Sequence, residues 1–454
     1  MLLIPKQLIS TTAIRYSKIS LETGANTDMT IKERVQQTKI ESSPVLAAST
    51  EAQRNAALAL IADRLYENRE AIFAANREDC TQAEKDGVAT PVLKRLLFNE
   101  SKLDGVLTGI RDLISLPDPI GHATLSRELD EGLTLHRVTC PIGVIGVIFE
   151  ARPDALIQIS TLCLKTGNCA VLKGGSETMR SNKVLFDIIY QAAVDAGLPA
   201  GCLIQAEARS EISELLACDD SVDLLIPRGS NAFVRYIMDN THIPVMGHAD
   251  GICHSYVDAS ADIAKAIRIL VDAKTQYVAV CNATETLLVH QAVAAQFLPE
   301  LKKAFDEKQV TLRGNEAVQA VIPCELMTEE EYKTEYLDYI LSVKIVNDID
   351  EAIRHINYYG SHHTDSIITE DRAAAEHFMQ LVDSASCYMN CSTRFADGYR
   401  YGFGAEVGVS TGKLHARGPV GLEGLVTYKY KLFGDGHIVG DYAEGRRSFH
   451  FKDL

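Results

Sequence analysis

The stretch PIGVIGVIFEARP at residues 141–153, followed by TGNCAVLKGGSE at residues 166–177, decides the fold class. It contains two short apolar runs, VIGVIF and CAVLK, separated by a segment from about Pro153 that has the length of a helix. Fully apolar strands that alternate with helices are typical of a parallel sheet covered on both faces. The stretch therefore predicts a β-α-β unit with the usual right-handed crossover.

The same alternation extends in both directions along the chain. Downstream, a helix is expected through residues 184–197, then strands at 202–206 and 222–227 with a short helix between them. Upstream, Thr50 and Gln53 have the spacing of a capping box and predict the start of an amphipathic helix. We expect a doubly wound nucleotide-binding domain.

The alternation of strands and helices is interrupted at residues 127–140 and again near the end of the chain. RELDEGLTLHRVTC at residues 127–140 centres on a glycine turn and predicts a β-hairpin that projects from the domain, or a surface loop. A second α/β region is expected over about 247–420, and GLVTYKYKLFGDGHIVGDY at 424–442 again has strand-like residues around a glycine turn.

The composition excludes several classes of function. A net charge of −16 and a pI near 5.3 argue against nucleic-acid binding, because a polyanion requires clustered Lys and Arg. Eleven scattered cysteines, an odd number, indicate a reducing compartment rather than a disulfide framework. No apolar run approaches the roughly 20 residues needed to span a bilayer. We expect a cytoplasmic protein.

The first 28 residues allow two interpretations. Before Glu22 the segment has no acid and contains Lys6, Arg15 and Lys18 among Ser and Thr, as organelle transit peptides do. Three basic residues are few, and ordered patterning begins near Met29. We therefore favour a disordered extension over residues 1–28.

No metal site is expected from the cysteine and histidine spacing. The sequence contains no C-x-x-C pair, and its nearest spacing is that of Cys387 and Cys391. The pair His362 and His363 is far from both in the sequence.

Standard phosphate-binding motifs are missing, since neither G-x-G-x-x-G nor G-x-x-x-x-G-K-[ST] occurs. The strand that ends in Lys173, Gly174 and Gly175 provides another possibility. A lysine at the carboxyl end of a parallel strand lies where α/β sheets bind ligands. A surface lysine at a turn is the ordinary alternative.

Three further segments hold candidate functional residues. In IPRGSN, Arg228, Gly229 and Ser230 precede a helix whose free amides would favour an anion. Cys281 lies among small and polar residues, and the amide groups of Asn282 beside it suit the oxyanion of thioester chemistry. The C-terminal third is rich in cations and glycine and suits a carboxylate or phosphate, or forms a salt-bridged surface loop; its cations are Arg394, Arg400, Lys413, His415 and Arg417.

Taken in order, these segments resemble the aldehyde dehydrogenase superfamily over nearly everything after Met29. PIGVIGVIFEARP, GNCAVLKGGSE, Cys281 with Asn282, and EYLDYILSVKIVNDIDEAIRHIN carry the general resemblance. A branch that reduces acyl phosphates is indicated by IPRGSNAFVRYI, HADGICHSYVD, DAKTQYVAVCNATETLL, STRFADGYRYGFGAEVGVST and HARGPVGLEGL.

The resemblance implies a role for individual residues. Cys281 is expected to be the nucleophile, Lys173 a ligand of the adenosine ribose and its phosphate, and Glu335 the carboxylate beside the nicotinamide ribose. The cofactor-binding set comprises Lys173, Gly175, Ser176, Arg228, Gly229, Ser230 and Glu335; the substrate-binding set comprises Arg394, Arg417 and His248; and the catalytic set comprises Cys281, Asn282 and Arg152.

Three positions depart from aldehyde-oxidising relatives. His248 replaces a glutamate that activates water, Arg152 replaces an oxyanion-stabilising asparagine, and Ser176 replaces a glutamate that binds the ribose hydroxyls of NAD. The first two replacements suit an acyl phosphate, and the third suits NADPH.

The resemblance also implies a domain organisation and a homo-oligomer. We expect an NADPH-binding domain at 29–126 and 141–246, a catalytic domain at 247–420, and oligomerisation strands at 127–140 and 421–454.

The implied reaction is the NADPH-dependent reduction of L-glutamyl 5-phosphate to L-glutamate 5-semialdehyde and phosphate, through a cysteine thioester, in proline biosynthesis. Transient contact with glutamate 5-kinase is a further implied partnership. A semialdehyde-oxidising member of the superfamily and a non-catalytic nucleotide-binding protein are the alternatives.

Overall fold

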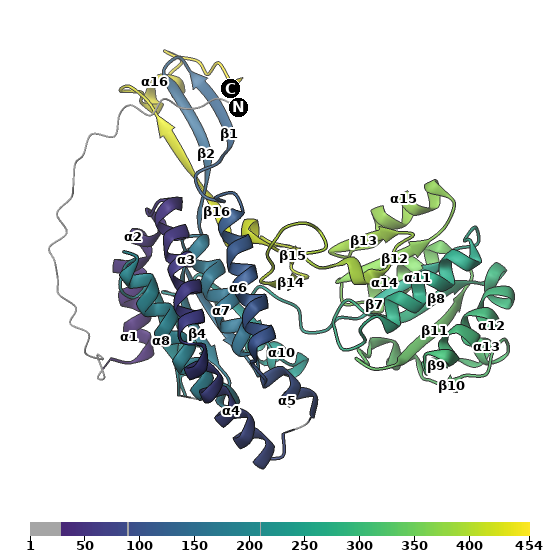
Figure 1. The fold of residues 1–454 in the computed structure, drawn as a ribbon. Coiled ribbons are helices and arrows are strands. Elements are labelled where there is room, and N and C mark those ends of the chain that lie inside the picture. Colours follow the sequence, from purple (N-terminus) through teal and green to yellow (C-terminus); the bar gives the residue numbers. More distant parts are fainter. Residues whose placement is uncertain (1–28, 89, 209) are drawn as a thin grey trace.

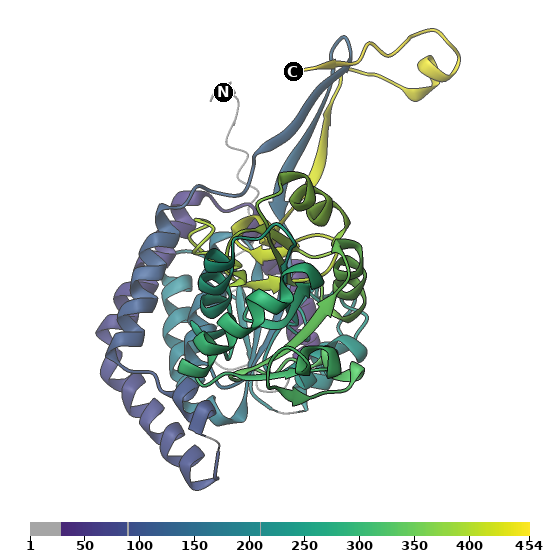
Figure 2. The same ribbon diagram turned by 90° about the vertical axis from the view of Figure 1, so that its right-hand side faces the viewer.

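The computed structural model describes residues 29–454 except 89 and 209, so the segment 1–28 lies outside the described residues. Two α/β bodies lie side by side, and a narrow arm of strands rises above them (Figure 1). The turned view shows the same arm projecting well beyond both bodies (Figure 2).

The first body is built on a four-stranded parallel sheet with the order β5-β4-β3-β6. All six residues of its inner strand β3 are buried, which explains the absence of polar side chains there. The predicted strands are confirmed as β3 (Val144–Phe149), β4 (Cys169–Gly174), β5 (Leu203–Ala206) and β6 (Leu224–Arg228).

Helices surround this sheet, and the one after β3 is almost wholly buried. The capping box predicted at Thr50 is present, with Gln53 as its partner. The helical elements are α1 (Ile31–Gln37), the π-helical turn η1 (Thr38–Ser42), α2 (Ser43–Ala47), α3 (Glu51–Glu67), α4 (Arg69–Lys85), α5 (Thr90–Leu96), α6 (Glu100–Ser115), α7 (Pro153–Lys165), the 3₁₀ turn η2 (Ser176–Thr178), α8 (Met179–Asp195), α9 (Glu211–Leu216) and α10 (Asn231–Asp239).

The second body contains a seven-stranded parallel sheet with the order β10-β9-β11-β8-β7-β12-β13. Its strands are β7 (Cys253–Val257), β8 (Thr284–His290), β9 (Thr311–Gly314), β10 (Glu325–Leu326), β11 (Ile340–Val346), β12 (Thr364–Ile368) and β13 (Ser386–Met389). Its helical elements are α11 (Ile263–Thr275), α12 (Gln291–Glu307), α13 (Glu316–Gln319), η3 (Glu329–Lys333), α14 (Ile349–Tyr359) and α15 (Arg372–Leu381).

The arm is a four-stranded antiparallel sheet with the order β16-β2-β1-β17. The predicted hairpin is confirmed as β1 (Ala123–Asp130) and β2 (Leu133–Pro141), joined at Gly132, whose φ is +73°. The end of the chain completes the arm with β16 (Val426–Phe433), α16 (Val439–Ala443) and β17 (Lys452–Asp453). The segment before it, which lies outside the arm, contains η4 (Thr393–Phe395), the two-stranded sheet of β14 (Gly408–Ser410) and β15 (Gly418–Val420), and η5 (Leu422–Leu425).

Packing ties the late part of the chain back to the first body. Apolar residues after the second sheet join the hydrophobic core of the first sheet; they are Ala405, Val407, Val420, Leu422 and Leu425. The second body has its own cores on the two faces of its sheet. Among the helices of the described residues, none is long and apolar enough to cross a membrane.

The order of strands in the first sheet places a crevice beside β3. The chain runs from β3 outward through β4 to β5, and then returns to β6 on the other side of β3. Doubly wound sheets bind ligands at the carboxyl ends of strands where the order reverses in this way. Here those ends carry residues 150–152 and 228–230.

Candidate active site

Cys281 lies in the loop between α11 and β8 and is partly exposed. Two neighbouring side chains hold this loop by hydrogen bonds to its backbone carbonyls. The Cys253 thiol donates to the carbonyl of Cys281 at 3.2 Å, and the Thr393 hydroxyl donates to the carbonyl of Asn282 at 2.7 Å. These contacts hold Cys281 at the amino end of β8, next to the amino end of β7.

The side-chain amide of Asn282 is already engaged. Its Nδ2 donates to the carbonyl of Ala396 at 2.8 Å, while its buried Oδ1 has no hydrogen-bond partner within the described part of the chain. The amide therefore anchors the loop, and it would have to leave Ala396 before it could donate to a bound oxyanion.

Gly251 makes room for Cys281. A Cβ atom at this position would lie 2.3 Å from the carbonyl oxygen of Cys281 and 2.5 Å from its Cβ. Real Cβ atoms do not approach other atoms so closely, and here the obstructing atoms belong mainly to backbone. Glycine at position 251 is consequently a condition for the position of Cys281.

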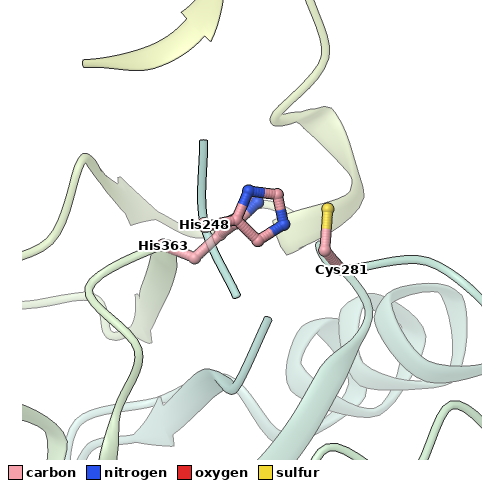
Figure 3. Close-up of side chains that lie close together, drawn as sticks. All are labelled: His248, Cys281 and His363. Carbon is pink, nitrogen blue, oxygen red and sulfur yellow. The ribbon is translucent and has the colours of Figure 1, made fainter. Parts of the chain in front are cut away.

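Two histidines lie beside the thiol, as Figure 3 shows. One ring nitrogen from each of His248 and His363 and the Sγ of Cys281 all lie within 4.8 Å of one another. His248 comes from the segment that joins the two bodies, and His363 comes from the amino end of β12. Burial lowers the pKa of His248, so its imidazole is neutral near pH 7.

His363 is not among the site residues predicted from the sequence. His363 is far from Cys281 in the chain, but β7 lies between β8 and β12 in the sheet, so their amino ends converge. Although His363 is far from these cysteines in the sequence, it lies 3.7 Å from the thiol of Cys253, and one of its ring nitrogens lies within 4.8 Å of the Sγ of Cys281.

Two guanidinium groups interact electrostatically with Cys281, those of Arg228 and Arg394, and Arg152 in turn acts on Arg228. Burial lowers the pKa of Arg228, and the nearby charge of Arg152 lowers it further, whereas Glu406 and Cys281 act in the opposite direction. Burial likewise lowers the pKa of Arg394, and Cys281 is among the groups that oppose this shift. The pocket around the thiol is therefore suited to an anionic ligand.

Arg228 thus has its side chain in a different environment from the one expected. A Cβ at Gly408 would lie 2.5 Å from its Nη1, so the guanidinium packs against β14. Only its backbone belongs to the turn that was predicted to bind a cofactor.

Arg417 is held away by an acid. Its Nη2 lies 3.1 Å from Asp383 Oδ1, and Lys413 forms an ion pair with the same carboxylate at 2.5 Å. These two cations form part of a salt-bridged surface loop, the alternative that the sequence left open. Arg400 donates to the carbonyl of Arg394 at 2.7 Å and so supports that side chain.

The crevice at the end of the first sheet carries the expected cofactor residues. Lys173 is buried with its Nζ donating to the carbonyl of Gly174 at 2.7 Å, and Ser176 is exposed beside it. A Cβ at Gly175 would lie 2.1 Å from the carboxylate of Glu177. A side chain at position 175 would therefore require the Glu177 carboxylate to move.

Glu150 occupies the turn before α10, and the sequence analysis missed it. Its carboxylate accepts from the backbone N–H of Ser230 at 2.9 Å, and a Cβ at Gly229 would lie 2.4 Å from the same oxygen. The side chain of Ser230 makes no capping hydrogen bond. The Glu150 carboxylate is thus already bound at the start of α10, where the sequence predicted that the backbone amides would bind an anion.

Glu335 connects the second body to this turn. Its carboxylate accepts a short hydrogen bond from Asn231, which also donates to Asp250 at 3.2 Å. A buried ion pair supports the Glu335 loop: Lys274 lies 2.7 Å from Glu285, and Glu285 accepts from the N–H of Leu337. Burial raises the pKa of Glu285 to about 7.

The other cysteines are buried or partly buried, as is usual for this residue type. All eleven are free thiols. Burial raises the thiol pKa at ten positions: Cys80, Cys140, Cys163, Cys169, Cys202, Cys218, Cys253, Cys324, Cys387 and Cys391.

Comparison with known proteins agrees with this geometry. The aldehyde dehydrogenase family model matches residues 15–322. The chain belongs to the aldehyde dehydrogenase family. The gamma-glutamyl phosphate reductase of Acetivibrio thermocellus is 59% identical over 426 residues, which cover 94% of this chain and 99% of that protein.

Solved structures of the aldehyde dehydrogenase family confirm the fold. The crystal structure of gamma-glutamyl phosphate reductase from Thermotoga maritima superposes with a TM-score of 0.87 at 38% identity, covering 90% of this chain and 98% of that one. An acetylating aldehyde dehydrogenase from Geobacillus thermoglucosidasius has a TM-score of 0.62 at 19% identity, which shows the shared fold alone. The resemblance and the fold class expected from the sequence are confirmed.

An aldehyde dehydrogenase fold implies a nicotinamide dinucleotide, and the crevice fits one. The N–H of Ser230 already donates to the Glu150 carboxylate, so this amide can bind an oxyanion, and Gly175 and Gly229 add no side chain of their own there. Lys173, at the carboxyl end of β4, supplies a cation at the same edge.

Gly251→Ala should reduce turnover sharply while a nearby control remains active. The added methyl would displace the Cys281 backbone, and misplacement of a reacting group by about 1 Å can cost on the order of 100-fold in rate. Gly247→Ala is the matched control, because its Cβ would lie no closer than 3.8 Å to any atom. Steady-state kinetics on both variants would test this, and equal activity would contradict the packing argument.

Proposed function

We propose that this enzyme reduces L-glutamyl 5-phosphate to L-glutamate 5-semialdehyde and phosphate, with Cys281 as nucleophile, in proline biosynthesis. The observation that supports this most strongly is the environment of Cys281, where two imidazoles lie beside the thiol and the guanidiniums of Arg228 and Arg394 interact with it electrostatically. High identity to proteins named gamma-glutamyl phosphate reductase supports the choice of substrate.

The first step is attack by the Cys281 sulfur on the acyl carbon. The thiol proton has two acceptors within 4.8 Å, the imidazoles of His248 and His363. The neutral state of His248 at neutral pH suits this role, because a general base must arrive unprotonated. The thiol–imidazole arrangement supplies the base that no sequence motif identified.

The second step is departure of phosphate, which leaves a thioester on Cys281. Arg152, Arg228 and Arg394 are the cations that neutralise the phosphate and the substrate carboxylate, and Arg152 is the most exposed of the three. The proton taken from the thiol passes to the departing phosphate. Arg417 would join them only after leaving Asp383.

The oxyanion that forms at the acyl carbon needs hydrogen-bond donors. The side chain of Asn282 serves only if it leaves Ala396, so we assign the role first to the backbone N–H of Asn282. The carbonyl of this residue is fixed by Thr393, which keeps the peptide groups of the loop in place.

NADPH is the cofactor we propose, held by Lys173, the backbone of Gly175 and Ser176, the turn Arg228–Ser230, and Glu335. When bound, it supplies the hydride that converts the thioester to the aldehyde. Because the Glu150 carboxylate accepts from Ser230, a pyrophosphate would have to displace it from the amide.

The proposed partners follow from the arm and the composition. Strands β16 and β17 form the two outer edges of the arm, and β16 exposes Tyr428, Tyr430, Leu432 and Phe433. Unpaired edges with exposed apolar residues favour pairing with another copy of the chain. A homo-oligomer, a cytoplasmic location and transient contact with glutamate 5-kinase remain proposals.

Cys281→Ala should abolish turnover. Loss of the nucleophile is expected to lower kcat by a factor on the order of 10⁴ or more, by analogy with other covalent catalysts. Binding of NADPH and the unfolding temperature should not change, and Cys387→Ala and Cys391→Ala should stay active. The assay couples glutamate, ATP, glutamate kinase and NADPH, and retained turnover without Cys281 would refute the assignment.

NADPH should be preferred over NADH. Ser176 is exposed near Lys173 and carries no charge that would repel a 2′-phosphate. Ser176→Glu should therefore raise the KM for NADPH by about tenfold or more, with a smaller effect on NADH. Ser101→Glu, an exposed serine on α6, is the charge-matched control. Equal efficiency of the wild-type enzyme with both cofactors would contradict the proposal.

The reverse reaction should require phosphate. Position 248 holds an imidazole in place of the water-activating carboxylate, so the Cys281 thioester formed from the semialdehyde and NADP should persist until phosphate attacks it. NADP reduction should stall near one turnover in phosphate-free buffer and resume when phosphate or arsenate is added. Sustained reduction without phosphate, with glutamate as product, would instead indicate an aldehyde-oxidising enzyme.

A further inference from the structure

We propose that His248, Cys281 and His363 form a zinc site that reversibly blocks the nucleophile. The three residues come from three separate segments and converge in one pocket (Figure 3). This inference rests on their geometry and goes beyond the reductase activity, since it would hold for any reaction of Cys281.

The distances suit a tetrahedral ion. With Zn–N near 2.0 to 2.1 Å and Zn–S near 2.3 Å, ligand atoms of a tetrahedral zinc site lie about 3.3 to 3.6 Å apart. Here the three ligand atoms lie within 4.8 Å of one another, so side-chain shifts of about 1.5 Å or less would close the site. Soft sulfur and imidazole ligands select zinc over magnesium or calcium.

The hydrogen bonds leave the correct nitrogens available. Nδ1 of His248 lies 2.8 Å from the carbonyl oxygen of Val409, and Nδ1 of His363 lies 2.9 Å from the Thr364 hydroxyl. Both rings therefore have Nε2 left to bind an ion. A histidine that binds a metal usually donates its other N–H to such an oxygen, which fixes the ring.

An unpartnered buried atom points independently to a ligand. His363 is fully buried, and its Nε2 has no hydrogen-bond partner among the described residues. A buried polar atom without a partner is costly. A metal ion bound at Nε2 would remove that cost.

The charges nearby do not prevent binding of a cation. The carboxylates of Glu335 and Asp250 and the guanidinium of Arg228 all act on His248. Arg394, which acts on Cys281, is a second cation, so two acids face two cations around the three ligands. Three protein ligands also leave a fourth position free for water or phosphate.

Binding exchanges a proton for the metal without any redox change. The Cys281 thiol releases its proton to solvent as the Zn–S bond forms, and the two imidazoles bind through lone pairs. The sulfur electron pair that would attack the substrate is then committed to the ion. Zinc should thus compete both with substrate and with thiol reagents.

The first test uses the full chain after treatment with a chelator. One equivalent of Zn²⁺ should protect Cys281 from iodoacetamide, followed by mass spectrometry of its peptide, and EDTA should restore labelling. Co²⁺ should give a thiolate-to-metal charge-transfer band that Cys281→Ser lacks. Unprotected labelling in the presence of stoichiometric Zn²⁺ would overturn the proposal.

Matched variants test the two histidines. His363→Asn should weaken Zn²⁺ binding by about 100-fold or more, since loss of a ligand should cost at least as much as loss of its supporting contacts. His362→Asn, the neighbouring histidine outside the group, should bind Zn²⁺ as the wild-type chain does. If His363→Asn does not fold, His248→Asn tests the same site.

Equal affinity in the folded histidine variants and the wild-type chain would also overturn the proposal. None of these measurements uses an acyl phosphate. A failure of the zinc site would therefore leave the reductase assay unaffected, and a failure of the reductase assay would leave the zinc titration interpretable.

Discussion

The active site depends on the absence of a side chain at Gly251. The backbone of the segment that joins the two bodies passes so close to Cys281 that a Cβ there would lie 2.3 Å from its carbonyl oxygen. This close approach lets the thiol of Cys253 support the Cys281 carbonyl from β7, while Thr393 supports the next carbonyl. A displaced loop would lose both contacts, and the thiol would move away from the imidazoles. The chemistry of the pocket follows from this steric constraint.

The two sheets face the candidate site with opposite ends of their strands. The first sheet presents carboxyl ends, where the crevice beside β3 carries Lys173 and the turn at Arg228–Ser230. The second sheet presents the amino ends of β7, β8 and β12, which bring together Gly251, Cys281 and His363. Asn231 and Glu335 connect the two bodies by a hydrogen bond. The residues proposed to bind the cofactor and those around Cys281 thus come from different sheets but can lie next to each other.

Positive charge around Cys281 is balanced by acids that sequence patterns did not reveal. Arg228 is buried near Glu406, a carboxyl group whose pKa is raised by burial, and Glu150 occupies the amide of Ser230. An anionic substrate or cofactor therefore replaces interactions within the protein. Each ligand charge then replaces an ion pair or hydrogen bond that the protein already has, so each contributes less to the free energy of binding. Ligands with several charges, such as acyl phosphates and dinucleotides, are favoured for this reason.

The sequence by itself determined the β-α-β units, the hairpin and the family, and it singled out Cys281, because apolar periodicity and local motifs involve residues close together in the chain. It also placed Lys173 and Ser230 at strand ends. Only the tertiary structure decided where long side chains go. It directed Arg228 toward Cys281, tied Arg417 to Asp383, engaged Asn282 with Ala396, and brought His363 to the thiol. The physical reason is that strand order in a parallel sheet brings together the ends of β7, β8 and β12, and no local pattern encodes which strands will be neighbours.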